Sequence, residues 1–232
     1  MYGWNDLMDI ETDKHNPRKD SFLFGARLEN SQSRWLMKNI VWFQLPFLPL
    51  FVWIAGYKML LWLGLMLFAN ALYNGPGPGT KNYPGLDILS QVGYLLIFVL
   101  SSWLNNVPQL PMTTMIFAAL FAMHSHLFGQ LMDIEADRKA GRQTTANVIG
   151  VLLGKWLLIA ILITESLIIW QRDIFVAGFL ATSAIVFAVD ALFVFKNRPY
   201  PSIIVKIFFV GWNLIAVVSM HWLWARGTLV AQ

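Results

Sequence analysis

The stretch TTMIFAALFAMHSHLFGQLMDIEAD, residues 113–137, begins as an apolar run and ends in an acidic cluster. Residues 113–132, folded as a helix, are long enough to cross about 30 Å of hydrocarbon. The last seven letters, LMDIEAD, occur almost unchanged near the start of the chain, as LMDIETD at residues 7–13. The stretch therefore predicts a membrane-spanning helix that ends in one of two related acidic clusters.

The composition is that of an integral membrane protein. Of the residues, 57% are apolar, 15% aromatic and only 13% charged, whereas soluble proteins average about 25% charged. Four acids in the first thirteen residues exclude a cleaved signal peptide. Because cysteine is absent from the sequence, any metal would be held by oxygen or imidazole. The pI near 9.4 comes from bases scattered over loops, which does not indicate nucleic-acid binding.

Six further stretches match the first in length and apolarity. The seven predicted spans cover residues 39–57, 59–73, 88–104, 113–132, 147–170, 174–195 and 203–224. Turn-rich segments at 74–87, 105–111 and 196–202 separate some of them. We expect an all-α, polytopic membrane helical bundle of about seven spans that forms one domain over residues 1–232.

Threading these spans across the membrane brings both acidic clusters to one side. Fourteen of the 17 Lys and Arg fall on that same side, the others being Lys58, Arg172 and Arg226. The excess of positive charge predicts that this face is cytoplasmic. The two clusters are therefore expected to share a face and a site.

The acidic residues within each cluster have helical spacing. Asp6, Asp9 and Asp13 would lie on one face of a helix, as would Asp133 and Asp137. Like charges at this spacing repel one another and are costly to desolvate, so the arrangement favours a bound cation. Oxygen-only ligands of this kind suit Mg²⁺. The alternative is that each cluster is a solvated helix end.

Basic residues follow the clusters closely. They are Arg18 and Lys19 after the first cluster, Arg138, Lys139 and Arg142 after the second, and Lys81 in a glycine-rich loop. Bases beside Mg²⁺-binding carboxylates can bind a diphosphate and neutralise it as a leaving group. For any single base, membrane orientation is the alternative explanation. At a membrane surface, the combination indicates a lipid diphosphate, above all an isoprenoid.

Three motifs resemble those of the UbiA superfamily of intramembrane prenyltransferases. NDLMDIETD at 5–13 is similar to the family's NDxxDxxxD motif, and DIEADRKAGRQTTANVIG at 133–150 resembles its second motif. YNGPGPGTKNYPGLD at 73–87 is similar to the loop between them. The resemblance covers essentially the whole chain. It implies Mg²⁺-dependent ionisation of an allylic prenyl diphosphate, attack on the carbocation by a hydrophobic acceptor, and proton loss.

The resemblance also implies roles for individual residues. The metal ligands would be Asp6, Asp9, Asp13, Asp133 and Asp137, of which Asp6, Asp9, Asp133 and Asp137 would be catalytic. The substrate-binding residues would be Asn5, Arg18, Lys81, Arg138 and Lys139.

The flanks of the motifs suggest a branch of the family. NPRK at 16–19 and TTA at 144–146 look most like the lycopene elongase and C50 carotenoid branch. A carotenoid acceptor and a dimethylallyl diphosphate donor would follow. The alternatives are an aromatic acceptor, as in quinone or chlorophyll-tail synthesis, and a non-catalytic lipid- or pigment-binding subunit. A cation transporter is disfavoured because its coupling site should lie near the bilayer midplane.

Two features depart from the family pattern. The family has nine membrane helices with the first acidic motif at the end of the second, whereas here that motif begins at residue 5. The first two helices are thus expected to be absent. In addition, Gly79 and Tyr83 stand around Lys81, where relatives carry further bases.

Several other polar residues fall inside predicted spans. We expect His124 to contact a neighbouring helix, with proton acceptor as the alternative role. Glu165 and Asp190 are either functional or close enough to a span end to reach water. Lys155 is expected to extend its ammonium group to the membrane surface.

Overall fold

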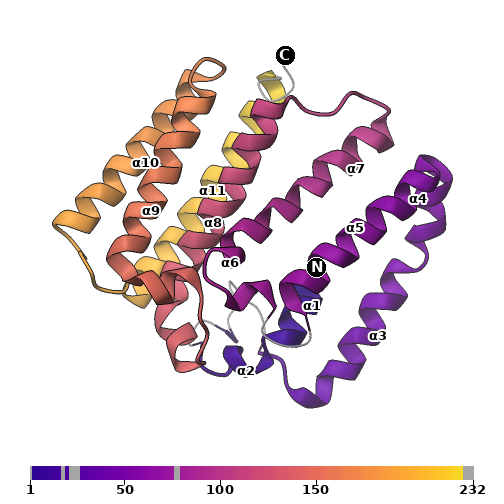
Figure 1. Ribbon diagram of the computed structural model, residues 1–232, viewed down its shortest axis with the longest axis horizontal. Helices are drawn as coiled ribbons and strands as arrows, with labels where there is room; N and C mark the ends of the chain where they lie inside the picture. The colour runs from indigo at the N-terminus through magenta and orange to yellow at the C-terminus, as the bar shows by residue number, and fades with distance from the viewer. Residues whose placement is uncertain (1, 17–18, 21–26, 76–78, 227–232) are drawn as a thin grey trace. The chain divides into compact units, whose positions relative to one another are not determined.

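The computed structural model describes residues 2–16, 19–20, 27–75 and 79–226. Every regular element in these ranges is helical (Figure 1), which confirms the all-α prediction. The α-helices are α1 (Tyr2–Met8), α2 (Ile10–Asp13), α3 (Ser33–Gln44), α4 (Phe47–Ala55), α5 (Tyr57–Asn74), α6 (Leu86–Leu89), α7 (Leu96–Asn105), α8 (Met112–Lys139), α9 (Thr145–Ile169), α10 (Ile174–Leu192) and α11 (Ser202–Arg226). Three short 3-10 helices accompany them: η1 (Asn30–Gln32), η2 (Thr80–Asn82) and η3 (Ser90–Leu95).

The chain divides into two compact units. The first unit comprises residues 1–109 and 135–144, and the second comprises residues 110–134 and 145–232. Helix α8 therefore contributes its length up to Ile134 to the second unit and its end from Glu135 to the first. The prediction of one domain over the whole chain stays a prediction.

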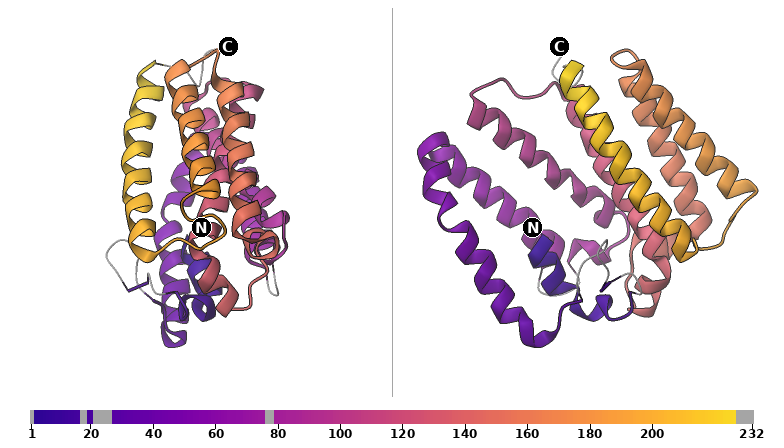
Figure 2. Two further views of the ribbon diagram at one scale, coloured as in Figure 1. Left: turned by 90° about the vertical axis from the view of Figure 1, so that its left-hand side faces the viewer. Right: turned by 180° about the vertical axis from the view of Figure 1, so that it is seen from behind.

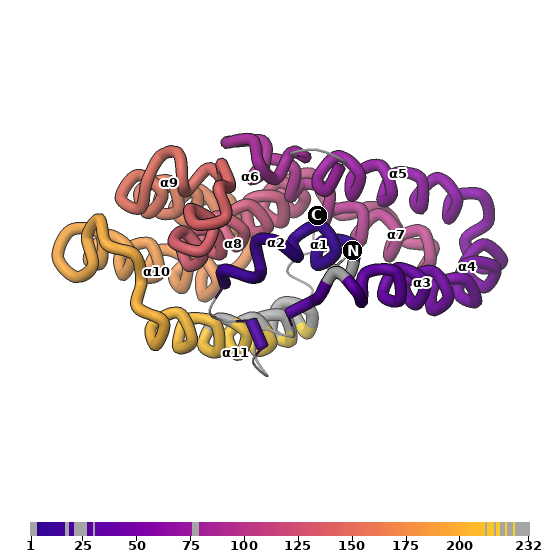
Figure 3. Tube along the Cα trace, turned by 90° about the horizontal axis from the view of Figure 1, so that it is seen from below, coloured from indigo at the N-terminus to yellow at the C-terminus, as the bar shows by residue number. Residues whose placement is uncertain are grey.

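In the first unit, α5 packs against α4 and α7 (Figure 1). The Trp62 indole N–H donates to the Leu96 carbonyl at 2.7 Å. A break at Pro46, which has no N–H to continue the helix, separates α3 from α4. Gly56, with φ 62°, then reverses the chain into α5. Helix α1 lies beside α3 and α5 (Figure 3), so the first acidic cluster is held by two membrane helices.

The second unit is built around antiparallel helices. Helices α9 and α10 run antiparallel (Figure 2), and Asp173 caps α10 by accepting from the backbone N–H of Phe175 at 3.0 Å. Helices α8 and α9 come close because Gly154 has no side chain, and a Cβ there would lie 2.7 Å from the Leu131 side chain. Five aromatic rings from α8, α10, α11 and the intervening loop complete the packing: Phe128, Phe187, Phe195, Tyr200 and Phe208.

The helices identify the chain as an integral, multi-pass membrane protein. Among the residues that the structure describes, five helical stretches are long and apolar enough to span a membrane: Ser33–Ala55, Leu86–Asn105, Met112–Lys139, Thr145–Ile169 and Ile174–Leu192. The other two predicted spans correspond to α5 and α11. The first span begins at Ser33, earlier than predicted, because α3 also includes residues 33–38, of which Ser33, Arg34 and Lys38 are polar. Many large apolar side chains are exposed, as expected for surfaces that face lipid.

The prediction that Lys155 extends to the membrane surface is wrong. Its side chain is fully buried, and its Nζ lies 2.7 Å from Asp190 Oδ2 and donates to the Lys196 carbonyl at 3.0 Å. The Tyr200 hydroxyl donates to the same Asp190 oxygen at 2.6 Å. A carboxylate within reach makes burial of the ammonium less costly than it would be alone.

Candidate active site

The first acidic cluster is interrupted at Asp9. The backbone of Asp9 has φ −103° and ψ 5°, so α1 and α2 are separate and the prediction of one continuous helix is wrong. The helical hydrogen bonds persist across the break, from Asp9 N–H to the Asn5 carbonyl at 2.9 Å and from Asp13 N–H to the Asp9 carbonyl at 2.8 Å. Asp9 and Asp13 are buried, whereas Glu11 is exposed. Asp9 and Asp13 therefore point inward and Glu11 points outward despite the break.

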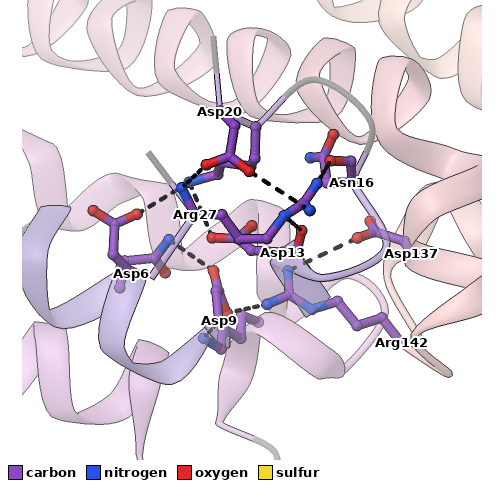
Figure 4. A network of polar contacts seen from close by, with 11 residues as sticks. Asp6, Asp9, Asp13, Asn16, Asp20, Arg27, Asp137 and Arg142 are labelled. Carbon is purple, nitrogen blue, oxygen red and sulfur yellow. Dashed lines mark hydrogen bonds and ion pairs between the residues drawn. The ribbon is translucent and has the colours of Figure 1, made fainter. Parts of the chain in front are cut away.

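Asp9 accepts hydrogen bonds from three side chains. Asn5 Nδ2 donates to Oδ2 at 2.8 Å, and Lys81 Nζ donates to Oδ1 at 2.6 Å. The Arg142 guanidinium also donates to Oδ1, and Figure 4 shows it reaching toward both Asp9 and Asp137. Its Nη1 lies 3.8 Å from Asp137 Oδ1. Arg142 therefore connects the two acidic motifs, which lie about 130 residues apart in the sequence.

The end of α8 explains the position of Arg142. Gly141 has φ 69°, the left-handed conformation that glycine adopts readily. The Gly141 N–H bonds to the Arg138 carbonyl at 3.1 Å, and the Arg142 N–H bonds to the Asp137 carbonyl at 2.9 Å. This pair of bonds is the Schellman motif that ends many helices. The turn brings Arg142 back beside Asp137, while Arg138 and Lys139 remain exposed on α8.

Lys19 links the other two carboxylates of the first motif. Its Nζ lies 3.0 Å from Asp13 Oδ2 and 3.4 Å from Asp6 Oδ1. Burial raises the pKa of Asp13, and the negative charges of Asp9 and Asp6 raise it further against the effect of Lys19. Burial alone would lower the pKa of Lys19, but its two carboxylate partners outweigh burial and raise it. The cluster is thus a site where negative charge accumulates and needs cations.

Lys81 reaches the site from the loop after α5. It is 6% exposed, and burial lowers its pKa although Asp9 opposes the shift. The buried Asn74 accepts a second hydrogen bond from its Nζ at 3.1 Å. Gly79 shapes this loop because its φ is 49° and a Cβ there would overlap the Tyr73 carbonyl oxygen. A side chain in place of Gly79 would displace the loop that carries Lys81.

Arg27 holds the segment after the first motif and was missed by the sequence analysis. Its Nε donates to the Asp13 carbonyl and its Nη2 to the Asn16 carbonyl, both at 3.1 Å (Figure 4). Its backbone N–H donates to Asp20 Oδ1 at 2.7 Å. These bonds join Asp13, Asn16 and Asp20 to Arg27, which lies before α3 in the chain. The sequence carries no periodic or motif signal for them.

The structure brings most of the predicted site residues together in the first unit. Asn5, Asp6, Asp9, Asp13, Lys81 and Asp137 all belong to the network around Asp9 and Lys19 or to its Arg142 link. Asp133 is half-buried on the part of α8 that belongs to the second unit. Arg18 lies outside the described residues. The sequence predicted Lys19 and Arg142 only as bases near the motifs, but both contact the carboxylates, as Lys81 does.

The candidate ligand atoms of the protein are of the types that Mg²⁺ binds. Asn5 Oδ1 is buried without a hydrogen-bond partner, although its own Nδ2 bonds to Asp9. A buried amide oxygen beside carboxylates is the type of ligand that a hard divalent cation takes. Within the described ranges no three carboxylates or imidazoles converge, because Lys19, Lys81 and Arg142 lie among the acids. The Mg²⁺ site stays a prediction.

Comparison with known proteins gives one family. The model of the UbiA prenyltransferase family matches residues 1–214. The C(50) beta-cyclic carotenoids biosynthesis protein LbtBC of Dietzia sp. (strain CQ4) is 30% identical over 165 residues, which are 69% of this chain and 38% of that protein. The lycopene elongase/hydratase of Haloarcula japonica is 31% identical over 150 residues, 65% of this chain and 50% of that protein.

A similar lycopene elongase/hydratase from Corynebacterium glutamicum is 31% identical over 155 residues, 65% of this chain and 53% of that protein. The chain thus matches between 38% and 53% of the length of these three relatives. No solved structure is significantly similar to it.

Proposed function

Because the chain belongs to the UbiA prenyltransferase family, we propose that it transfers a prenyl group from an allylic prenyl diphosphate to a hydrophobic acceptor in the membrane. The main support is the arrangement at Asp9, where a buried lysine and an arginine converge on one carboxylate oxygen. Two cations on one oxygen are more than a single carboxylate requires for charge balance. Lys81 and Arg142 are therefore suited to bind an anion if a divalent cation replaces them at Asp9.

The ligand-free network explains why metal and diphosphate should bind together. Lys81 and Arg142 can donate to diphosphate oxygens only when they leave Asp9. A buried carboxylate that loses its cations is destabilised by several kcal/mol unless another cation replaces them. Mg²⁺ bound by Asn5 and the carboxylates Asp6, Asp9, Asp13, Asp133 and Asp137 would supply that charge and stabilise the diphosphate as a leaving group.

The protein residues have distinct parts in this scheme. Lys81 and Arg142 donate charge-assisted hydrogen bonds that orient the diphosphate as the allylic C–O bond breaks. When the Lys81 ammonium moves from Asp9 to the diphosphate, Asn74 can continue to accept a hydrogen bond from it. Burial of Asp9 and Lys81 keeps water away from the reacting end. The carbocation then reacts with the acceptor rather than with water.

For the substrates, we propose dimethylallyl diphosphate as donor and a carotenoid as acceptor. The support is the similarity to proteins named lycopene elongase/hydratase and C(50) beta-cyclic carotenoids biosynthesis protein. The exposed apolar surfaces of the helices are compatible with an acceptor that enters from the bilayer. We also propose that the acidic motifs face the cytoplasm, because most of the bases lie on their side of the predicted spans.

The experiment measures diphosphate release by the protein in liposomes with dimethylallyl diphosphate, lycopene and Mg²⁺. Asp9→Asn and Asp137→Asn should abolish release. Matched controls are Glu11→Gln and Glu135→Gln, which change exposed acids at equivalent positions of the two LMDIE repeats and should retain it. Absence of release with every allylic donor from dimethylallyl to geranylgeranyl diphosphate would contradict the proposal. Lipid or pigment binding without turnover would then favour the non-catalytic alternative.

A further inference from the structure

The second unit contains a buried acid and a buried histidine that have no part in binding the diphosphate in the proposed scheme. His124 on α8 and Glu165 on α9 approach with Nδ1 2.7 Å from Oε1, and their side chains are 2% and 0% exposed. The Phe121 ring packs edge-on against the imidazole, with 5.0 Å between ring centroids. Two ionisable groups are therefore held in contact and shielded from solvent.

A comparison with Asp190 indicates that Glu165 is not only structural. Asp190, also in the second unit, uses both oxygens: Oδ1 accepts from the Phe195 N–H at 3.1 Å, and Oδ2 binds Tyr200 and Lys155. Glu165 uses only Oε1, and its buried Oε2 has no hydrogen-bond partner. Leaving a buried acceptor without a hydrogen bond is costly, and more so when the group is charged. Buried polar atoms in native proteins nearly always have a partner, so this oxygen requires an explanation other than packing.

The depth of the pair in its helix supports this reading. His124 lies ten residues after Thr114, which contacts Arg172 at 2.8 Å, and nine residues before Asp133. At 1.5 Å per residue these separations are about 15 Å and 13 Å along α8. The pair thus lies near the middle of about 30 Å of hydrocarbon. Ionisable groups at that depth are functional candidates by default.

We propose that His124 and Glu165 accept the proton that the prenyl acceptor loses. This inference rests on the proposed function. The allylic C–O bond breaks with its electron pair going to diphosphate, and an alkene π pair of the acceptor forms the new C–C bond. An adjacent C–H bond then breaks, its electron pair forms the new double bond, and His124 Nε2 takes the proton. Glu165 accepts from Nδ1–H and stabilises the imidazolium.

The chemistry of the other buried groups singles out this pair. Lys155 is a cation that pairs with Asp190, so neither can take a proton without breaking the network with Tyr200. An imidazole oriented by a carboxylate can take a proton at its second nitrogen without losing the first hydrogen bond.

The test compares products rather than rates. Wild type, His124→Asn and Glu165→Gln are reconstituted in liposomes with dimethylallyl diphosphate, lycopene and Mg²⁺, and alkene product is counted per diphosphate released. Both variants should lose at least tenfold in this ratio, with prenyl alcohol or hydroxylated acceptor accounting for the difference. Asp190→Asn, the control for loss of a buried carboxylate, should lower thermal stability but leave the ratio unchanged.

A second measurement uses wild type and does not depend on whether the variants fold. In protein labelled with ¹⁵N-histidine, the His124 signal should change from imidazole to imidazolium during turnover. An unchanged His124 signal, or an unchanged product ratio in folded variants, would overturn the inference while the prenyltransferase proposal stands. Failure of wild type to release diphosphate with any allylic donor would overturn both.

Discussion

Replacing Lys81 by methionine tests the core of the proposed site. The change keeps the length of the side chain but removes the ammonium that donates to Asp9 at 2.6 Å and to Asn74 at 3.1 Å. A buried hydrogen bond to a charged group contributes about 1.5–3 kcal/mol. If Lys81 transfers this bond to the diphosphate in the transition state, Lys81→Met should lower kcat/KM by about 10- to 150-fold.

The assay is diphosphate release in liposomes over a range of donor concentrations at saturating Mg²⁺. Lys14→Met is the matched control, because Lys14 also pairs with an acid, Glu11, but on an exposed surface where such pairs contribute about 0–1 kcal/mol. It should change kcat/KM less than about fivefold. Equal losses in both variants, or a Lys81→Met variant as active as wild type, would refute the reasoning.

Three further predictions concern the neighbourhood of the site and the second unit. Gly79→Ala should lower the free energy of unfolding by about 1–3 kcal/mol, because φ is positive and the new Cβ would overlap the Tyr73 carbonyl. Thermal unfolding in detergent measures this loss, and Gly64→Ala is the control because a Cβ there meets no other atom. Asp190→Ala should cost about 3–5 kcal/mol in the same assay, since it leaves a buried lysine unpaired. Asn5→Ala should raise the Mg²⁺ concentration needed for half-maximal diphosphate release, and an unchanged metal titration would contradict the assigned ligand role.

Composition and periodicity were sufficient to predict the fold class. Long apolar runs predict helices regardless of tertiary context, because a membrane requires every backbone group to be bonded within the span. The exact helix ends were less predictable. Helix α3 continues beyond the apolar run into residues 33–38, which include the polar Ser33, Arg34 and Lys38, and no sequence signal marks the interruption at Asp9.

The carboxylates of the site were predictable and their partners were not. The repeated pattern, LMDIETD and LMDIEAD, marks Asp9, Asp13, Asp133 and Asp137 because acids are rare in this chain. Arg142 and Arg27 gave no comparable signal, since any loop base can be explained by membrane orientation. Only the turn at Gly141 shows why Arg142, rather than Arg138, reaches the acids.

Buried polar atoms that lack a hydrogen-bond partner distinguish residues that stabilise the fold from residues that could still bind a ligand. In the Lys155 network both oxygens of the acid are bonded, as expected where stability is the requirement. By contrast, Asn5 Oδ1, Thr80 Oγ1 and Thr144 Oγ1 are buried without partners. Thr80 precedes Lys81 and Thr144 follows Arg142 by two residues, so each unsatisfied hydroxyl adjoins a cation of the proposed site. A hydroxyl can donate to a phosphate oxygen and an amide oxygen can bind Mg²⁺. These three atoms are therefore of the types that a metal diphosphate would satisfy.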